Sequence, residues 1–150
     1  MARLEIYVDG ASRGNPGPSG IGILIKDHKG NDLVRCGKFL GETTSNVAEY
    51  SALTRALKIL MRQEKDTDSI NLLIKSDSEL MINQLTGAYR IRSKNLIPLV
   101  IEARRLLKRF KGAEFQLLSR AANKVADKLA NKSMNLQEDI DELRETIKAL

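Results

Sequence analysis

The stretch YVDGASRGNPGPSGIGILIK, residues 7–26, decides how the rest of the chain is interpreted. It begins within an apolar run in which Leu4, Ile6 and Val8 recur at every second position, as in a half-buried strand. Asp9 closes that run, a loop of glycine, proline and small polar residues follows, and an apolar pattern then resumes. The stretch therefore predicts two strands joined by a tight loop, with a carboxylate at the end of the first strand.

The rest of the chain alternates between patterns typical of strands and of helices. Residues 20–41 predict a hairpin around the turn DHKGND. Apolar residues at helical spacing predict a helix over 43–63, with Ser45 or Asn46 as its cap. We expect further strands at 69–77, buried on both faces, and at 113–120, and further helices at 78–89, 95–112 and 123–135. This order predicts one α/β domain with a five-stranded mixed sheet flanked by helices.

Size and composition limit the class of protein. With 150 residues, of which 42% are hydrophobic, the chain is long enough for one well-buried core and too short for two. No run approaches the ~18 apolar residues of a membrane span, and the N-terminus enters a strand pattern directly. We therefore expect no membrane association and no secretory signal. The single cysteine, Cys36, cannot form an internal disulfide, which favours a reducing, cytoplasmic compartment.

The charge of the chain is unevenly distributed. The formal net charge is +6, yet residues 136–150 hold five acids and only two bases. The first 135 residues are therefore strongly basic, which predicts a polyanionic partner such as nucleic acid. The only histidine, His28, lies in the predicted hairpin turn, where we expect a solvated loop residue rather than a general base.

Four acids occupy comparable places, at the ends of the first and fourth predicted strands and in the first turns of two predicted helices. They are Asp9, Asp77, Glu49 and Asp127. Ligands of open α/β sheets gather at the carboxyl ends of strands, so parallel neighbouring strands would bring these acids to one edge. Such a cluster is costly unless divalent cations neutralise it, and oxygen ligands suit Mg²⁺ or Mn²⁺. The alternative, four dispersed acids among 19, stays open at this point.

Four segments together resemble the motifs of type 1 ribonuclease H, in that family's order. They are YVDGASRGNPGPSGIG, TTSNVAEYSAL, IKSDSELMINQL and NKVADKLAN, and the resemblance covers residues 1–134 as one domain. It implies the ribonuclease H-like fold and a metal-dependent endonuclease. That enzyme would hydrolyse the RNA strand of RNA–DNA hybrids and leave 5′-phosphate and 3′-hydroxyl ends.

The resemblance also implies the roles of the four acids. Two Mg²⁺ ions, for which Mn²⁺ could substitute, would flank the scissile phosphate. Asp9 would bridge both ions. Glu49 and Asp77 would bind on one side and Asp127 on the other.

Two groups of substrate-binding residues follow from the same resemblance. Contacts to the RNA strand, including its 2′-hydroxyl groups, would come from Ser12, Asn15, Glu49 and Glu79. Contacts to the DNA strand would come from Thr44, Ser45, Asn46 and Asn95. As residue types, Ser45, Asn46 and Asn95 are equally suited to capping helices, so both roles stay open.

Three features depart from the family pattern. Bacterial members often carry a basic helical protrusion with tryptophans, whereas this chain has GAYRIRSKN and no Trp, which leaves Arg90, Arg92 and Lys94 to grip the substrate. A loop histidine found in some members is missing, and Arg120 is the nearest candidate to contact the phosphate. Glu79 stands where several members have glutamine.

Residues 135–150 lie outside the resemblance and predict an appended amphipathic helix. Its apolar stripe consists of Leu136, Ile140, Leu143, Ile147 and Leu150. The helix could pack on its own domain or join two copies into a homodimer. Three alternative functions also stay open: a non-catalytic hybrid- or duplex-binding module of the same fold, a nuclease that also cuts double-stranded RNA, and an interaction protein that uses this helix.

Overall fold

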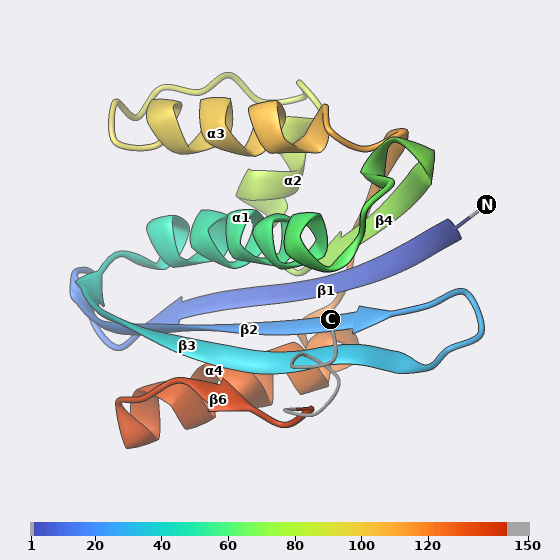
Figure 1. The fold of residues 1–150 in the computed structure, drawn as a ribbon. Helices are drawn as coiled ribbons and strands as arrows, with labels where there is room; N and C mark the ends of the chain where they lie inside the picture. Colours follow the sequence, from blue (N-terminus) through green and yellow to red (C-terminus); the bar gives the residue numbers. More distant parts are fainter. Residues whose placement is uncertain (1, 144–150) are drawn as a thin grey trace.

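A six-stranded mixed sheet runs through the centre of the molecule (Figure 1). The computed structural model describes residues 2–143. The strands are β1 (Ala2–Ser12), β2 (Gly17–Lys26), β3 (Asp32–Thr43), β4 (Ile70–Ser76), β5 (Gly112–Leu117) and β6 (Ile140–Asp141). Their order across the sheet is β5-β4-β1-β2-β3-β6. β1, β2 and β3 are successive antiparallel strands, whereas β4 pairs in parallel with both β1 and β5.

Helices cover both faces of the sheet. They are α1 (Ser45–Gln63), α2 (Glu79–Leu85), α3 (Ile97–Leu107) and α4 (Lys124–Leu136), with short 3-10 turns η1 (Thr67–Ser69) and η2 (Arg120–Asn123). α1 packs on β1 and β2, and α3 lies outside α1 on the same side of the sheet (Figure 1). α4 covers β1, β2 and β3 from the opposite side. Within residues 2–143, no helix is both long enough and apolar enough to cross a bilayer.

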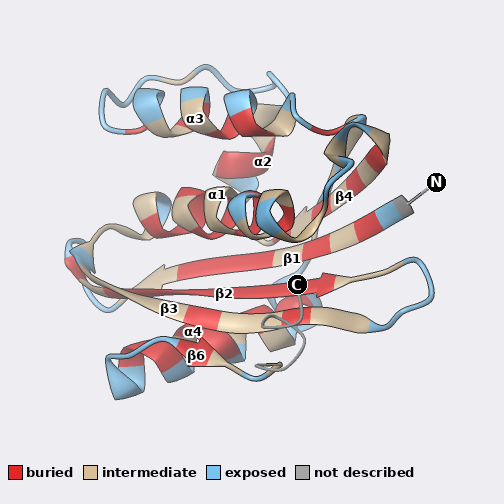
Figure 2. Cartoon of the chain, viewed as in Figure 1, coloured by how far each residue is buried: buried red, intermediate tan, exposed pale blue. Residues whose placement is uncertain are grey.

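The main core lies between α1 and the sheet, and β2 is its most deeply buried strand. Ile21, Ile23 and Ile25 of β2 are fully buried, and β2 is red along most of its length in Figure 2. β4 instead alternates between buried and half-buried residues, so the prediction that this strand is buried on both faces was wrong. The reason is the position of α4, which covers the far face of β2 but leaves that of β4 open.

The helices agree with the sequence patterns, but their ends differ. Thr44, rather than Ser45 or Asn46, caps α1, and its side chain accepts a hydrogen bond from the Val47 N–H at 3.3 Å. α3 is shorter than the predicted helix over 95–112. Asn95 does not cap α3, because the N-cap position is Leu96 and makes no side-chain bond to the helix.

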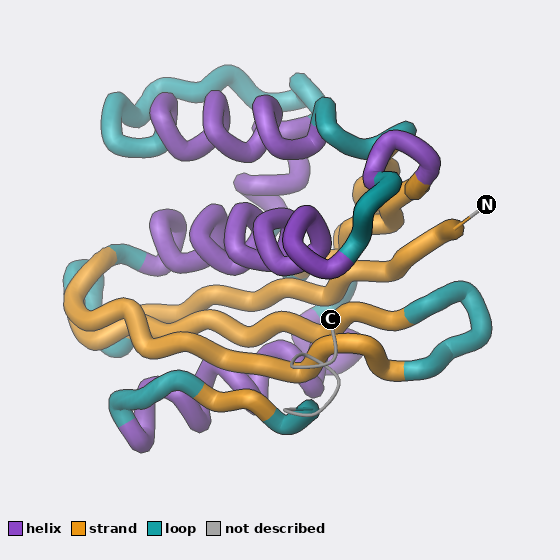
Figure 3. Tube along the Cα trace, viewed as in Figure 1, coloured by secondary structure: helices purple, strands orange, loops and turns teal. Residues whose placement is uncertain are grey.

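The C-terminal segment contributes a sixth strand, whereas the sequence predicts five strands and a helix over 135–150. α4 ends at Leu136, and Gln137 adopts the left-handed conformation, with φ 51°, which stops the helix. A short strand, β6, follows α4 and is drawn in orange near the end of the described chain in Figure 3. Ile140 of β6 pairs with Gly37 of β3 and is 8% exposed. The predicted helix is therefore wrong for residues 137–143, and its apolar stripe is interrupted there. Ile147 and Leu150 of that stripe lie outside the described residues.

Candidate metal centre at the carboxyl edge of the sheet

Asp9 and Asp77 lie at the same edge because β1 and β4 are parallel. The pairing between the two strands ends at Val8 and Ser76, so each acid follows the last paired residue of its strand. β1 itself continues to Ser12, and Asp9 is therefore paired with Gly22 of β2 rather than placed at the strand end as predicted. The condition on which the meeting of these acids depended, that the two strands are parallel neighbours, is therefore met.

A close contact between α1 and β1 places Glu49 beside Asp9. A Cβ atom added at Gly10 would lie 2.3 Å from the carbonyl carbon of Ala48, so only glycine allows α1 to approach this closely. The Gly10 N–H also donates a hydrogen bond to Oε1 of Glu49. The backbone immediately after Asp9 therefore fixes the Glu49 carboxylate.

A second close contact brings Asp127 in from the opposite face of the sheet. A Cβ atom added at Gly22, the cross-strand partner of Asp9, would lie 1.8 Å from the carbonyl oxygen of Ala126. Nδ2 of the buried Asn123 donates to the carbonyl oxygen of Val8 at 2.8 Å, which ties the start of α4 to β1. These contacts hold the first turns of α4, and hence Asp127, next to Asp9.

The structure brings all four predicted acids together, and we call them the carboxylate cluster. Carboxylate oxygens of Asp9, Glu49 and Asp77 lie within 4.8 Å of one another. Asp127 joins through its interaction with Asp9, and its buried Oδ1 has no hydrogen-bond partner among the described residues. Asp9 is 5% exposed and Glu49 is 8% exposed, so water can offset little of their mutual repulsion.

The electrostatics of the cluster favour protonation in the absence of a cation. Burial, with the charges of Glu49 and Asp77 and the interaction with Asp127, raises the pKa of Asp9 from 3.8 to about 9. Burial likewise raises the pKa of Glu49 to about 8, although the hydrogen bond from Gly10 opposes this shift. Within residues 2–143, no Lys, Arg or His forms an ion pair with any of the four acids. An oxygen-only, uncompensated donor set of this kind suits a hard divalent cation.

Several predicted RNA- and DNA-facing residues form one structural unit beside the cluster. The Ser12 hydroxyl donates to the carbonyl oxygen of Thr43 at 3.0 Å, and Asn15 Oδ1 accepts from the Ser45 N–H at 3.1 Å. The loop after β1 is thereby fastened to the start of α1, where Thr44 is the cap and Asn46 is exposed. The side chains of Ser12 and Asn15 are thus already engaged within the protein.

The other predicted substrate residues are more scattered. Glu79 is the first residue of α2, two positions after Asp77, and accepts a hydrogen bond from the Tyr89 hydroxyl at 3.0 Å. Asn95 and Arg120 are exposed, in the segment before α3 and in η2 respectively. Within residues 2–143, no hydrogen bond or ion pair joins these two to the carboxylate cluster.

Sequence reasoning missed the residues that position the acids. Gly22 and Asn123 had no assigned role, and Tyr50, whose hydroxyl donates to Gln84 at 2.7 Å, was not singled out. A glycine inside an apolar strand signals close approach of another backbone, so Gly22 could have been found from the sequence. The Tyr50–Gln84 bond joins α1 to α2 and had no detectable signal.

Comparisons with known proteins identify the family of this chain. Residues 7–133 match the family model described as reverse transcriptase-like. Ribonuclease HI of Halobacterium salinarum is 36% identical over 133 residues, which are 89% of this chain and 65% of that protein. A bifunctional protein of Mycobacterium tuberculosis is 32% identical over 89% of this chain but only 36% of its own length. The chain thus spans less than two thirds of these relatives.

The fold of this chain is also similar to that of a solved ribonuclease H1 structure. LC11-RNase H1 in complex with an RNA/DNA hybrid is 36% identical, and the match has a TM-score of 0.85. The match covers 89% of this chain and 98% of the LC11-RNase H1 chain. The two folds therefore correspond over nearly all of LC11-RNase H1. The chain belongs to the reverse transcriptase-like family and, within it, to type 1 ribonuclease H.

Proposed function

We propose that this protein is a metal-dependent endonuclease that hydrolyses the RNA strand of RNA–DNA hybrids and leaves 5′-phosphate and 3′-hydroxyl ends. The observation that carries the proposal is the carboxylate cluster, in which oxygens of three acids lie within 4.8 Å on the fold of ribonuclease H1. A non-catalytic binding module would gain nothing from burying these uncompensated acids. The raised pKa values of Asp9 and Glu49 are instead typical of a functional site.

The donor set supports two Mg²⁺ ions, with Mn²⁺ as a substitute. Asp9 is the central ligand of this proposal, because Glu49, Asp77 and Asp127 all act on its pKa. Glu49 and Asp77 would hold one ion and Asp127 the other. When bound, the cations would activate a water molecule and stabilise the leaving 3′-oxygen.

The chain's own groups prepare this site. The Gly10 N–H orients the Glu49 carboxylate, and Asn123 keeps α4 against β1. Protons held by Asp9 and Glu49 in the free protein must leave before a cation binds, because only ionised carboxylates are good ligands. Cation binding is therefore expected to strengthen as the pH rises.

Substrate recognition would use the unit built from the loop after β1 and the start of α1. Ser12 and Asn15 are bonded to Thr43 and Ser45, so they would hold the loop backbone in shape for the RNA strand. Glu79 would contact the RNA strand from α2. The DNA strand would be held by Thr44, Ser45, Asn46 and Asn95, with Arg120 near a phosphate.

A cleavage assay tests this proposal. Hybrid, double-stranded RNA and double-stranded DNA, each labelled on either strand, would be incubated with Mg²⁺, Mn²⁺ or EDTA. We expect cleavage of the RNA strand of the hybrid with either metal and none in EDTA. The double-stranded RNA arm decides whether that substrate is also cut. Cleavage of the hybrid in excess EDTA, or of its DNA strand, would contradict the proposal.

A further inference from the structure

A groove beside α4 gathers positive charge outside the carboxylate cluster. It has a volume of about 400 Å³, and its lining includes Arg35 of β3 together with Lys124, Lys128 and Lys132 of α4. The only acid in its lining is Glu142, which follows β6. We call this feature the α4–β3 groove.

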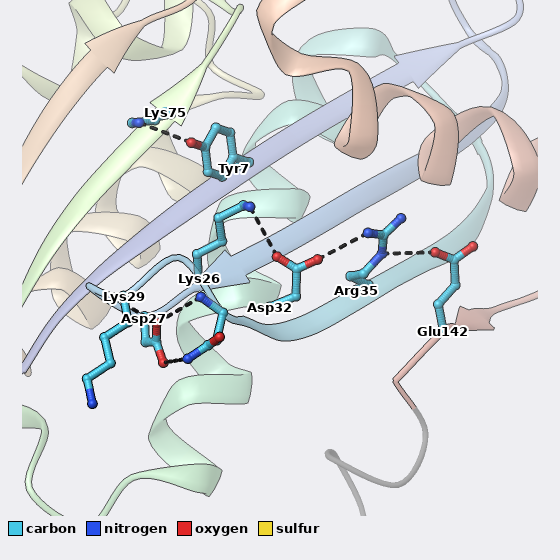
Figure 4. A network of polar contacts seen from close by, with 9 residues as sticks. Tyr7, Lys26, Asp27, Lys29, Asp32, Arg35, Lys75 and Glu142 are labelled. Atoms are coloured by element: carbon cyan, nitrogen blue, oxygen red, sulfur yellow. Dashed lines mark hydrogen bonds and ion pairs between the residues drawn. The ribbon is translucent and has the colours of Figure 1, made fainter.

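One end of the groove is neutralised by the C-terminal segment. Arg35 Nε donates to Glu142 Oε1 at 3.1 Å, and Lys132 Nζ lies 3.6 Å from Glu142 Oε2. Arg35 Nη1 also donates to Asp32 Oδ2 at 3.1 Å, and Asp32 Oδ1 lies 3.2 Å from Lys26 Nζ (Figure 4). Glu142 therefore sits between two cations, in the place that a phosphate oxygen could take.

The other end of the groove is not neutralised. Lys124 and Lys128 are exposed, and neither forms an ion pair within residues 2–143. With Lys132 they recur every four residues, so they lie on one side of the helix and about 6 Å apart along its axis. Like charges at this spacing repel each other, and a chain of anionic groups would relieve that repulsion.

We infer that the α4–β3 groove binds the phosphodiester backbone of an RNA–DNA hybrid, and that Glu142 occupies part of this surface in the free protein. The inference rests on the proposed function for the identity of the duplex. Phosphates would contact Lys124 and Lys128 directly and would displace Glu142 from Arg35 and Lys132. The groove would thus extend the binding surface from Asp127 along α4.

The first test removes the two unpaired cations. The dissociation constant for a hybrid would be measured in EDTA, where no cleavage occurs, over a range of salt concentrations. For Lys124→Ala/Lys128→Ala in the full chain we expect Kd to rise about tenfold at moderate salt, with a salt slope lower by about two. Thermal unfolding would confirm that the variant is folded.

A matched control separates the groove from net charge. Arg62→Ala/Lys65→Ala removes two exposed cations at the end of α1, close to η1, and changes the net charge equally. We expect the control to change Kd and the salt slope much less. If both double variants weaken binding equally, net charge alone is responsible and the inference is wrong.

The second test concerns Glu142. Glu142→Gln frees Arg35 and Lys132 for phosphate, so Kd should fall about threefold and the salt slope should steepen. Glu138→Gln removes the same charge from the same exposed segment and serves as the control. A Kd that is unchanged in Glu142→Gln would overturn the part assigned to Glu142.

Two further outcomes would overturn the inference as a whole. One is an unchanged Kd and salt slope in the Lys124→Ala/Lys128→Ala variant. The other is a variant that keeps its hybrid affinity but loses binding to vesicles containing an anionic lipid, which would make the groove a lipid-binding surface. Failure of the proposed function gives a different result: wild-type protein would bind the hybrid in EDTA but would not cut it when Mg²⁺ is added.

Discussion

The carboxylate cluster and the α4–β3 groove both use α4, but they treat charge in opposite ways. In the cluster, acids from β1, α1, α4 and the loop after β4 meet, and none of them forms an ion pair with a cation within residues 2–143. Around the groove, the charges alternate from Lys26 through Asp32 and Arg35 to Glu142 (Figure 4). The carboxylate cluster needs a cation from outside the chain. Most charges around the groove are instead neutralised by other side chains of the protein.

This difference separates the uncompensated acids of the cluster from the paired charges beside the groove, namely Lys26, Asp32, Arg35 and Glu142. Alternating, half-exposed charges contribute a little to stability and need no ligand. Buried like charges destabilise the free protein, and that cost is relieved only when a cation binds. Neutralising one acid of the cluster should therefore stabilise the metal-free protein, whereas neutralising one acid beside the groove should destabilise it.

The largest expected effect follows from removing the central ligand. Asp9→Asn keeps the volume of the side chain but removes its charge, so hydrolysis of the hybrid should fall by more than about a hundredfold. Hybrid binding in EDTA should be retained. The measurement is initial rate with Mg²⁺, and Glu114→Gln, at an exposed acid of β5, is the control. Near-normal turnover of Asp9→Asn would contradict the metal-ligand assignment.

The next effect is the pH dependence of stability without metal. The pKa of Asp9 is about 9 and that of Glu49 about 8 in the folded protein, against 3.8 and 4.5 as ordinary values. Between these limits the folded protein holds protons that the unfolded chain lacks, so stability is highest at acidic pH and falls as the pH rises towards 9. Each such proton corresponds to about 1.4 kcal/mol per pH unit, or about 3–6 °C in Tm.

Thermal unfolding in EDTA from about pH 5 to pH 9 measures this slope. Asp9→Asn should flatten it, and Glu114→Gln should leave it as in the wild type. A melting temperature that rises through this range would show that the four acids do not repel one another in the folded protein.

Added Mg²⁺ should restore part of the stability that the metal-free protein loses as the pH rises. At a Mg²⁺ concentration about ten times its Kd, linkage stabilises the folded state by about 1.4 kcal/mol, which raises Tm by about 3–6 °C. The increase should grow with pH and be much smaller in Asp9→Asn. Calorimetry with and without Mg²⁺ tests this, and an equal increase in both proteins would place the cation elsewhere.

The smallest effect is expected beside the groove. Asp32→Asn leaves Lys26 and Arg35 without their shared acid, so it should lower the free energy of unfolding by about 1 kcal/mol, or Tm by about 2–4 °C. The loss should be independent of Mg²⁺ and smaller at high salt. Asp9→Asn should instead raise Tm in EDTA. If both substitutions shift Tm in the same direction, the contrast between the two regions does not hold.

The sequence predicted the cluster better than its surroundings. Asp9 and Asp77 each follow an apolar run in the sequence, so chain order predicted that they meet if the two strands are parallel neighbours, as they are. The burial of β4 on both faces was predicted wrongly, because periodicity does not tell which strand a distant helix covers. The tail was predicted as a helix from its spacing, but pairing of Ile140 with β3 is a long-range contact. The bond between Arg35 and Glu142 spans 107 positions and had no local signal.

The position of α4 on the sheet depends on the absence of a side chain at Gly22. This glycine carries no functional group, yet it sets the depth at which α4 rests on the sheet, because an added Cβ would overlap the Ala126 carbonyl oxygen. Any larger residue would lift the start of α4 and carry Asp127 away from Asp9. The missing side chain of Gly22 on β2 therefore sets how closely Asp127 approaches Asp9. A survey that ranked residues by their chemistry alone would overlook the position that controls the spacing of the site.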